Sequence, residues 1–431
     1  MKKPQIKCQN TNILKTIKSK YILKIILGNL EKIKLMSLIQ YNKLCQRIMD
    51  IKTKDYQKEY YKIELEIIPP ENKFGKFINV NDNHRRYFNF YFNGKKESIK
   101  SNKFTPSDHV KFIIIKTSYK LKYFNTLFSN VKCIKKIKFI RFHRRDFKDL
   151  SNMFANCLSL EEINFNNKFN TSFSINLSHM FDKCSSLKIL NLSNLKVNNV
   201  INMSHMFNGC TSLKEINLSN LDARNVINMS HMFNGCSSLK EIILSNFQTY
   251  KVVNLSNMFS GCSSLIHLNL YALVTIHVEN MFQMFKGCIS LKELDLSNFK
   301  TSNLIMMNEM FSQCYSLEKL DLSKFNTENI KIINLRLKKM NFIFVNTDNV
   351  DYIKSLIKSD FSILKLDFSN FNIKNIVGLR NVFNDCFSLV QLKCDDDLIK
   401  KEFSNYLRIK ILIKGILFIN HYKIFNLLKK I

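Results

Sequence analysis

Hydrophobic residues in the middle of the chain recur at regular intervals. Successive phenylalanines in equivalent positions are 26 apart, except for one interval of 27 whose extra position falls in the turn at 166–168. Each period also carries the pattern L-x-x-L-x-L, as in Leu213-x-x-Ile216-x-Leu218, whose end alternates like a strand with one buried face. The same strand is expected at 239–244, 265–270, 291–296 and 317–322. The phenylalanines of this column are Phe128, Phe154, Phe181, Phe207, Phe233, Phe259, Phe285 and Phe311.

The second half of each period has helical spacing. Val200, Met203, Met206, Phe207 and Cys210 are separated by three, three, one and three residues, which places them on one stripe of a short helix. One such unit cannot bury both its strand face and its helical stripe, so we expect the units to stack. A period of about 20–29 residues built on this motif is typical of leucine-rich repeats. The predicted fold is therefore α/β, a leucine-rich-repeat solenoid of strand plus short helix. Glycine, which favours a left-handed residue at the end of a helix, precedes the cysteine at Gly209, Gly235, Gly261 and Gly287.

The repeats resemble a known family. LKEINLSNLDARNVINMSHMFNGC (213–236) and LKELDLSNFKTSNLIMMNEMFSQC (291–314) are similar to BspA-type leucine-rich repeats, with the core N-M-x-x-M-F-x-G-C. The resemblance implies a surface or secreted protein that acts in adhesion, with no enzymatic activity in the repeat. The chain departs from common leucine-rich repeats at the ninth position, where apolar residues replace the usual asparagine and are expected to pack inside. These residues are Leu195, Leu221, Phe247 and Phe299.

The chain divides into four predicted parts. Residues 1–70 form a basic helical module, with apolar residues at helical spacing over 12–50, and Pro69-Pro70 mark its end. Part of this module, 19–44, resembles an F-box, which implies a ubiquitin-ligase substrate adaptor; a generic helical cap is the alternative. Residues 71–125 form a strand-rich connector and N-terminal cap, and the pattern at 110–115 suggests an early repeat. The repeats occupy 126–394, irregular at 335–362, and 395–431 form a C-terminal cap.

Charge is distributed unevenly. The formal net charge is +32, with 35 basic and 12 acidic residues in 1–150 but 13 of each in 151–330. A basic N-terminal part could attract nucleic acid or anionic lipid, although a coding bias toward A and T would also enrich lysine. No stretch approaches the ~18 consecutive apolar residues of a membrane span. Lysines interrupt the apolar residues near the N-terminus, so no signal peptide is predicted. An intracellular, cytoplasmic location is favoured, and the cell surface is the alternative that the family resemblance implies.

Two repeated columns could carry chemistry. Eight of the twelve cysteines share one phase, and we expect a column of buried, reduced thiols, although neighbours would lie close enough for a disulfide. His179, His205 and His231 share the position before Met-Phe, each five residues before a cysteine. Zinc accepts such ligands, but the column continues as Asn, Gln and Glu, so we expect an outward polar row and no metal. The cysteines are Cys157, Cys184, Cys210, Cys236, Cys262, Cys288, Cys314 and Cys386.

The exposed positions of the strands are the candidate binding site, because repeat proteins bind partners on such faces. No phosphate-binding glycine loop, nucleophile elbow, HExxH or CxxC motif is present. We therefore expect a non-enzymatic interaction scaffold without a cofactor, whose partner is a protein and could be basic, since the face carries acids. The basic run 132–148 could bind nucleic acid, but an exposed capping strand is the favoured interpretation. The candidate residues are Glu215, Asn217, Glu241, His267, Asn269, Glu293, Asp295, Lys319 and Asp321.

Overall fold

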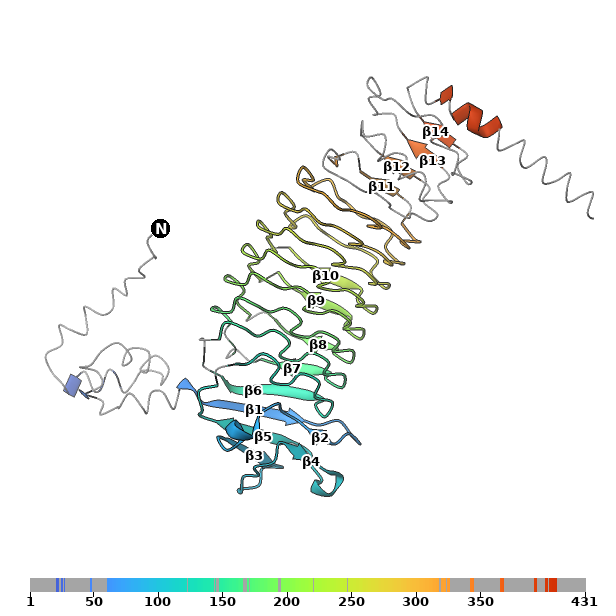
Figure 1. The fold of residues 1–431 in the computed structure, drawn as a ribbon. Coiled ribbons are helices and arrows are strands. Elements are labelled where there is room, and N and C mark those ends of the chain that lie inside the picture. The colour runs from blue at the N-terminus through green and yellow to red at the C-terminus, as the bar shows by residue number, and fades with distance from the viewer. Residues whose placement is uncertain are drawn as a thin grey trace, which may run out of the picture.

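The computed structural model describes residues 60–325 almost completely. The gaps in this range are 122, 143, 145–146, 166–168, 170, 193–194, 220, 246, 318 and 323; short pieces are also described at 21–22, 25, 27, 47–48, 342–344, 365–367, 391–393, 400–401 and 403–408. The regular elements of this part of the chain are mostly short strands, with few helices, and turns connect them (Figure 1). The complete helices are the four-residue α6 (Asp82–Arg85) and the three-residue 3-10 helix η1 (Pro106–Asp108). The strands are β1 (Ile63–Ile68), β2 (Gly75–Lys76), β3 (Phe88–Phe92), β4 (Lys103–Phe104), β5 (Ile113–Thr117), β6 (Lys136–Phe142), β7 (Glu162–Asn164), β8 (Ile189–Leu190), β9 (Glu215–Asn217), β10 (Glu241–Ile243), β11 (Lys319–Asp321), β12 (Phe342–Phe344), β13 (Lys365–Asp367) and β14 (Gln391–Lys393).

A six-stranded sheet connects the N-terminal region to the repeats. Its order is β3-β5-β1-β6-β7-β8, antiparallel from β3 to β6 and parallel from β6 to β8. The prediction that 1–70 is helical is therefore wrong at its end, because 63–68 form β1 in the middle of this sheet. The interpretation of 110–115 as an early repeat is also wrong, since β1 lies between β5 and β6. Phenylalanine rings fill the space beneath the sheet, with Phe77 against Phe90 at a centroid distance of 5.1 Å.

Most of the predicted helical module lies outside the described residues. The helical patterns over 12–50 and the F-box resemblance at 19–44 fall almost entirely there, and so do most of the predicted C-terminal cap at 395–431 and Cys386.

The repeated units, called coils from here on, stack in parallel. Isolated parallel bridges connect position 149 to 176 and then every equivalent residue up to 306, from Asp149↔Asn176 to Asn280↔Met306. The phenylalanines of the repeated column stack face to face from Phe128 to Phe311, with centroids 5.4–5.8 Å apart and planes within 11° of parallel. The coils thus form an elongated stack with one continuous interior, an arrangement consistent with a leucine-rich-repeat-like fold (Figure 1).

The predicted short helix in each coil is absent, because turns replace it throughout the described coils. Successive backbone N–H groups of this segment alternate between an acceptor in their own coil and an acceptor in the next coil. Met206 N–H donates to Met203 O three residues back, whereas Phe207 N–H donates at 2.9 Å to Met232 O of the next coil. The backbone also has positive φ at His205 (57°) and Gly209 (70°), which breaks an α-helix. The apolar spacing therefore describes inward-facing turns whose hydrogen bonds run between coils.

The interior columns are where the sequence places them. Met203, Met206 and Phe207 are fully buried, as are their counterparts in the neighbouring coils. The apolar residues at the ninth position, Leu195, Leu221, Phe247 and Phe299, are also buried, which confirms that they pack inside. The glycine before each cysteine has a φ of 70–72°, as predicted, although no helix ends there.

The strands do not form one uninterrupted ladder. Parallel β9 and β10 pair with each other, but the strands predicted at 265–270 and 291–296 are absent. Their backbones are only loosely linked: Lys292 N–H donates to Ile266 O at 3.4 Å, whereas Lys240 N–H donates to Lys214 O at 2.8 Å. Pairing resumes at β11, which is parallel to β12. β12 falls inside 335–362, where irregular repeats were predicted. Fewer residues separate Lys319 from its strand partner Phe342 than separate Glu215 from its partner Glu241, so this coil is shorter than the regular ones.

Candidate binding surface

The predicted strand positions form one exposed row, here called the strand face. Leu213, Ile216 and Leu218 are buried, while Glu215 and Asn217 between them are exposed. The same alternation recurs in the next coils. The exposed candidates are Glu215, Asn217, Glu241, His267, Asn269, Glu293, Asp295 and Asp321. Lys319 lies in β11, but its side chain is outside what the structure describes.

Three of these candidates also hold the turn that follows the strand. The side-chain oxygen Oδ1 of Asn217 accepts a hydrogen bond from Ser219 N–H at 2.9 Å, and Asn269 and Asp295 make the equivalent 2.9 Å bond two residues on. A hydrogen bond from the Ser297 side chain, and then the one from its backbone N–H, hold the pKa of the Asp295 carboxyl below its usual range. Such side-chain-to-backbone bonds define Asx turns, so these residues have a structural role that sequence reasoning missed.

The charge of the strand face is mixed. Each of the glutamates Glu215, Glu241 and Glu293 directly follows an exposed lysine, at Lys214, Lys240 and Lys292. Glu215 and Glu241 also lie opposite each other on paired strands, where like charges repel. The face therefore lacks the uniformly acidic character that a preference for a basic partner requires.

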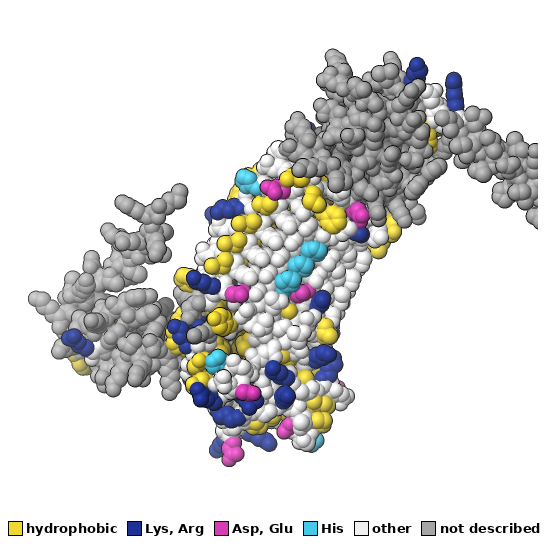
Figure 2. Space-filling view, viewed as in Figure 1, with side chains coloured by type: hydrophobic (Ala, Val, Ile, Leu, Met, Phe, Trp, Pro, Cys, Tyr) yellow, Lys and Arg dark blue, Asp and Glu magenta, His cyan; other side chains and the backbone are white. Residues whose placement is uncertain are grey.

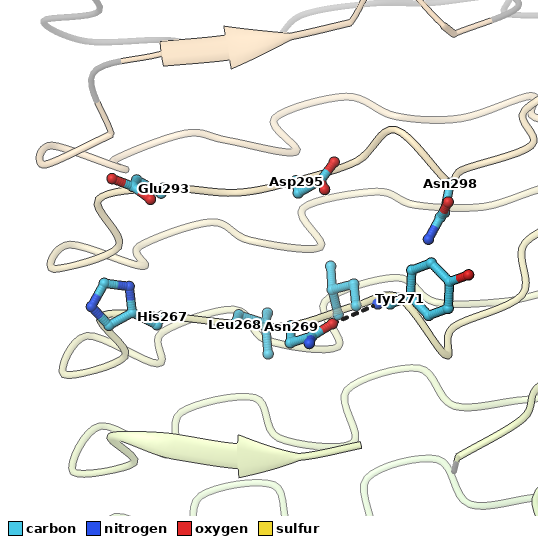
Figure 3. A pocket seen from close by; sticks show the side chains of 8 residues that line it. His267, Leu268, Asn269, Tyr271, Glu293, Asp295 and Asn298 are labelled. Atoms are coloured by element: carbon cyan, nitrogen blue, oxygen red, sulfur yellow. Dashed lines mark hydrogen bonds between the residues drawn. The ribbon is translucent and has the colours of Figure 1, made fainter. Parts of the chain in front are cut away.

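A hollow of about 430 Å³ opens on the strand face where the strand pairing is interrupted. It is lined by His267, Asn269, Tyr271, Glu293, Asp295 and Asn298, above the apolar Leu268 and Leu270. His267 and Glu293 lie at one end, and Tyr271 and Asn298 at the other (Figure 3). Four of the predicted site residues are thus brought together. Glu215, Asn217, Glu241 and Asp321 do not line this hollow.

Tyr271 and Asn298 are the site residues that the sequence analysis missed. Tyr271 is 79% exposed. The sequence carries a signal for it, because the equivalent position is serine in the neighbouring coils, at Ser193, Ser219, Ser245, Ser297 and Ser323. His267 breaks its own column in the same coil, where Glu215, Glu241 and Glu293 are the counterparts. The hollow therefore coincides with a departure from the repeat.

A second row, half-buried, contains the histidines His179, His205 and His231. Their rings stack face to face, with His205 4.4 Å from His179 and 4.3 Å from His231, and Figure 2 shows histidine side chains in a row along the coils. Asp182 Oδ2 lies 3.0 Å from His179 Nδ1. Partial burial, and then the neighbouring imidazoles, lower the pKa of His205 to about 4. Within the described residues, no group of three or more His, Cys, Asp or Glu side chains is arranged to hold a metal ion.

The cysteine column is buried and its thiols are free along the described coils. Each thiol donates to the carbonyl of the phenylalanine one coil earlier, as Cys236 Sγ does to Phe207 O at 3.1 Å. Burial raises the pKa of Cys157, Cys236 and Cys314 to about 12. The thiols are therefore protonated donors that satisfy turn carbonyls, and such thiols are poor nucleophiles.

The asparagine that precedes the buried methionine or leucine at the start of each inward-facing segment is a further column whose role sequence reasoning missed. Asn202 Oδ1 accepts from Ser204 N–H at 3.0 Å, and Asn228 and Asn254 repeat the bond at 2.9 Å. Asp149 does the same in the first coil. These Asx turns start the inward-facing segment at the same place in each coil, where the parallel bridges also form.

The basic run 132–148 contains β6, which lies between β1 and β7 and so is not a capping strand at an edge. Its residues Ile137 and Phe139 are buried, and Lys136 Nζ lies 2.7 Å from Glu162 Oε2. Part of the positive charge is therefore paired with the first coil.

The helices in the described part of the chain are all too short or too polar to cross a bilayer.

Comparison with known proteins gives a family and distant likenesses to solved structures. No curated protein matches the chain. A solved structure described as a leucine rich cell surface protein from Faecalibacterium prausnitzii A2-165 is 14% identical, covering 63% of this chain and 82% of its own, with a TM-score of 0.24. A likeness at this level carries no argument about function. The model of a family described as "Mycoplasma protein of unknown function, DUF285" matches residues 122–243, 148–269 and 254–344, more than half of the chain, and the chain belongs to this family.

Proposed function

We propose that the chain is a non-enzymatic interaction protein, a leucine-rich-repeat solenoid of the BspA-like type that binds a protein partner through its strand face. The observation that supports this most is the exposed polar row that repeats from Glu215 to Asp321, while the residues between its members are buried or, at Leu294, partly buried. Because successive coils are bonded through their backbones, this row is a rigid surface, and rigid surfaces lose little entropy on binding.

The interior columns support a role without catalysis. A nucleophilic cysteine requires a lowered pKa and access to substrate, whereas the cysteines of the coils are buried and burial raises their pKa. Their hydrogen bonds to backbone carbonyls explain the column as packing. The cofactor-free interaction scaffold expected from the sequence remains the proposal, and a protein partner is its central element.

The test is capture of a partner by the full chain and by variants of the strand face. We expect Glu215→Ala combined with Glu241→Ala and Glu293→Ala to weaken capture, because these side chains are exposed and make no packing contacts in the interior. Glu279→Ala is the matched control, since Glu279 is an exposed glutamate outside the strand face. Equal capture by the triple variant and the control would remove the strand face from the proposal.

The location decides in which setting the scaffold works. The sequence favours the cytoplasm, and the BspA resemblance implies the cell surface and adhesion. Protease treatment of intact cells that express the tagged chain separates the two, because only a surface-exposed chain is degraded.

A further inference from the structure

We propose that the hollow on the strand face binds a neutral oligosaccharide, with the Tyr271 ring as its platform. This inference goes beyond the protein contact proposed above, because it assigns the hollow a ligand of its own. The volume of about 430 Å³ is within the range of small-molecule sites. The segment from His267 to Tyr271 spans at most roughly 13 Å, at ~3.3 Å per residue for an extended chain, which is long enough for a short oligosaccharide.

Tyr271 supplies the apolar contact. The ring is 79% exposed, yet its own backbone is held, because Tyr271 N–H donates to Asn269 Oδ1 at 2.9 Å. An exposed ring on a held backbone offers a large contact area at a low entropic cost. The C–H face of a sugar ring packs on such a surface, while the phenol hydroxyl remains available for a hydrogen bond. Tyr271 stands at the end of the hollow beside Asn298 (Figure 3).

The repeat itself shows that Tyr271 is not needed for the fold. Five neighbouring coils have serine at this position, and the Asx turn forms equally with serine, since Ser219 and Ser297 donate the same backbone bond. A large apolar ring left in water contributes nothing to stability here. Its presence in the coil that also carries His267, between coils that have Glu241 and Glu293 at that position, is explained by a ligand.

The polar lining suits hydroxyl groups. Asn269 Oδ1 is already used in the turn, which leaves its Nδ2 group to donate. Asp295 uses Oδ1 for Ser297 N–H, which leaves Oδ2 to accept. The hollow thus offers both a donor and an acceptor, and each sugar hydroxyl both donates and accepts. A cationic ligand would need acceptors alone, and the exposed Lys292, which precedes Glu293 in the chain, opposes it.

The test uses the full chain on a glycan array that carries neutral and sialylated oligosaccharides, followed by calorimetric titration of the best-bound neutral one. Tyr271→Ser introduces the residue that neighbouring coils have, so this variant should fold. We expect it to weaken binding by about tenfold or more, which corresponds to ~1.4 kcal/mol. Tyr250→Ala is the matched control, because Tyr250 is an exposed tyrosine outside the hollow, and it should bind like the unaltered chain.

Three results would overturn the inference: no neutral oligosaccharide retained, equal affinity for Tyr271→Ser, or retention of oligolysine by the hollow in place of the glycan. The outcome is separable from that of the proposed function. Glu215 and Glu241 lie outside the hollow, so glycan binding that Tyr271→Ser weakens, together with unchanged protein capture by Glu215→Ala combined with Glu241→Ala, would contradict the protein contact alone.

Discussion

Replacement of Phe233 by alanine tests whether the stacked rings hold neighbouring coils together. Phe233 is fully buried, and its ring lies 5.4 Å from that of Phe207 and 5.8 Å from that of Phe259. Truncation of a buried phenylalanine to alanine destabilises a protein by about 3–5 kcal/mol, because apolar contacts are lost and a cavity remains. We expect a loss of free energy of unfolding in that range.

Phe233→Leu separates ring stacking from volume. Leucine keeps most of the buried surface but loses two aromatic pairs, each worth about 0.5–1.5 kcal/mol beyond area burial. The expected loss is therefore about 1–3 kcal/mol. Phe173→Ala is the control, because Phe173 is 60% exposed, and surface substitutions usually change stability by less than ~0.5 kcal/mol.

Urea unfolding of the full chain, followed by far-ultraviolet circular dichroism, measures these losses as shifts of the midpoint. Repeat arrays can unfold in parts, so hydrogen exchange of the amides between Phe207 and Phe259 provides a local reading. A Phe233→Ala variant no less stable than Phe173→Ala would refute the view that the coils share one packed interior.

Three further predictions concern the turns and the columns. The pKa of His205 is about 4 in the folded chain against 6.5 for a free histidine, so the unfolded state binds more protons between these values and stability should fall as the pH drops from 6.5 to 4. After allowance for partial exposure we expect a loss of roughly 1–2 kcal/mol, measured by thermal unfolding and largely absent in His205→Asn. Asn228→Ala should cost about 1 kcal/mol in urea unfolding through loss of the Ser230 bond, and Asn228→Asp should restore most of it, because Asp149 makes the same bond. Cys236 should resist a thiol reagent at pH 8 until the chain unfolds, since it is buried and protonated; rapid native labelling would contradict this.

The sequence was sufficient to predict the period and the sidedness of each coil. Met203, Phe207 and Cys210 are buried and Glu215 is exposed because their positions follow from spacing alone. The prediction of a short helix in each unit was wrong for a physical reason. Its apolar spacing is real, but alternate amides such as that of Phe207 bond to the next coil, and no property of a single unit reveals a partner that lies in another unit.

The rest of the fold depends on contacts between residues that are distant in the sequence. Residues 63–68 alternate like a strand, IELEII, but their place between β5 and β6 depends on pairing with distant segments, such as Ile67↔Ile113 and Ile63↔Phe142. The hollow could be anticipated only in part. Tyr271 is visible as a break in a serine column, whereas the interrupted strand pairing beside it depends on how far neighbouring coils separate.

The backbone bonds between coils have an evolutionary consequence. Each coil offers the next coil the same backbone donors and acceptors that the preceding coil offers to it. The bonds from Phe207 N–H to Met232 O and from Phe233 N–H to Met258 O, which are equal in length, illustrate this match. Duplication or deletion of one whole unit of the gene would therefore leave both new junctions chemically matched. Related chains can lengthen or shorten their recognition surface in fixed steps while the junctions between units stay intact.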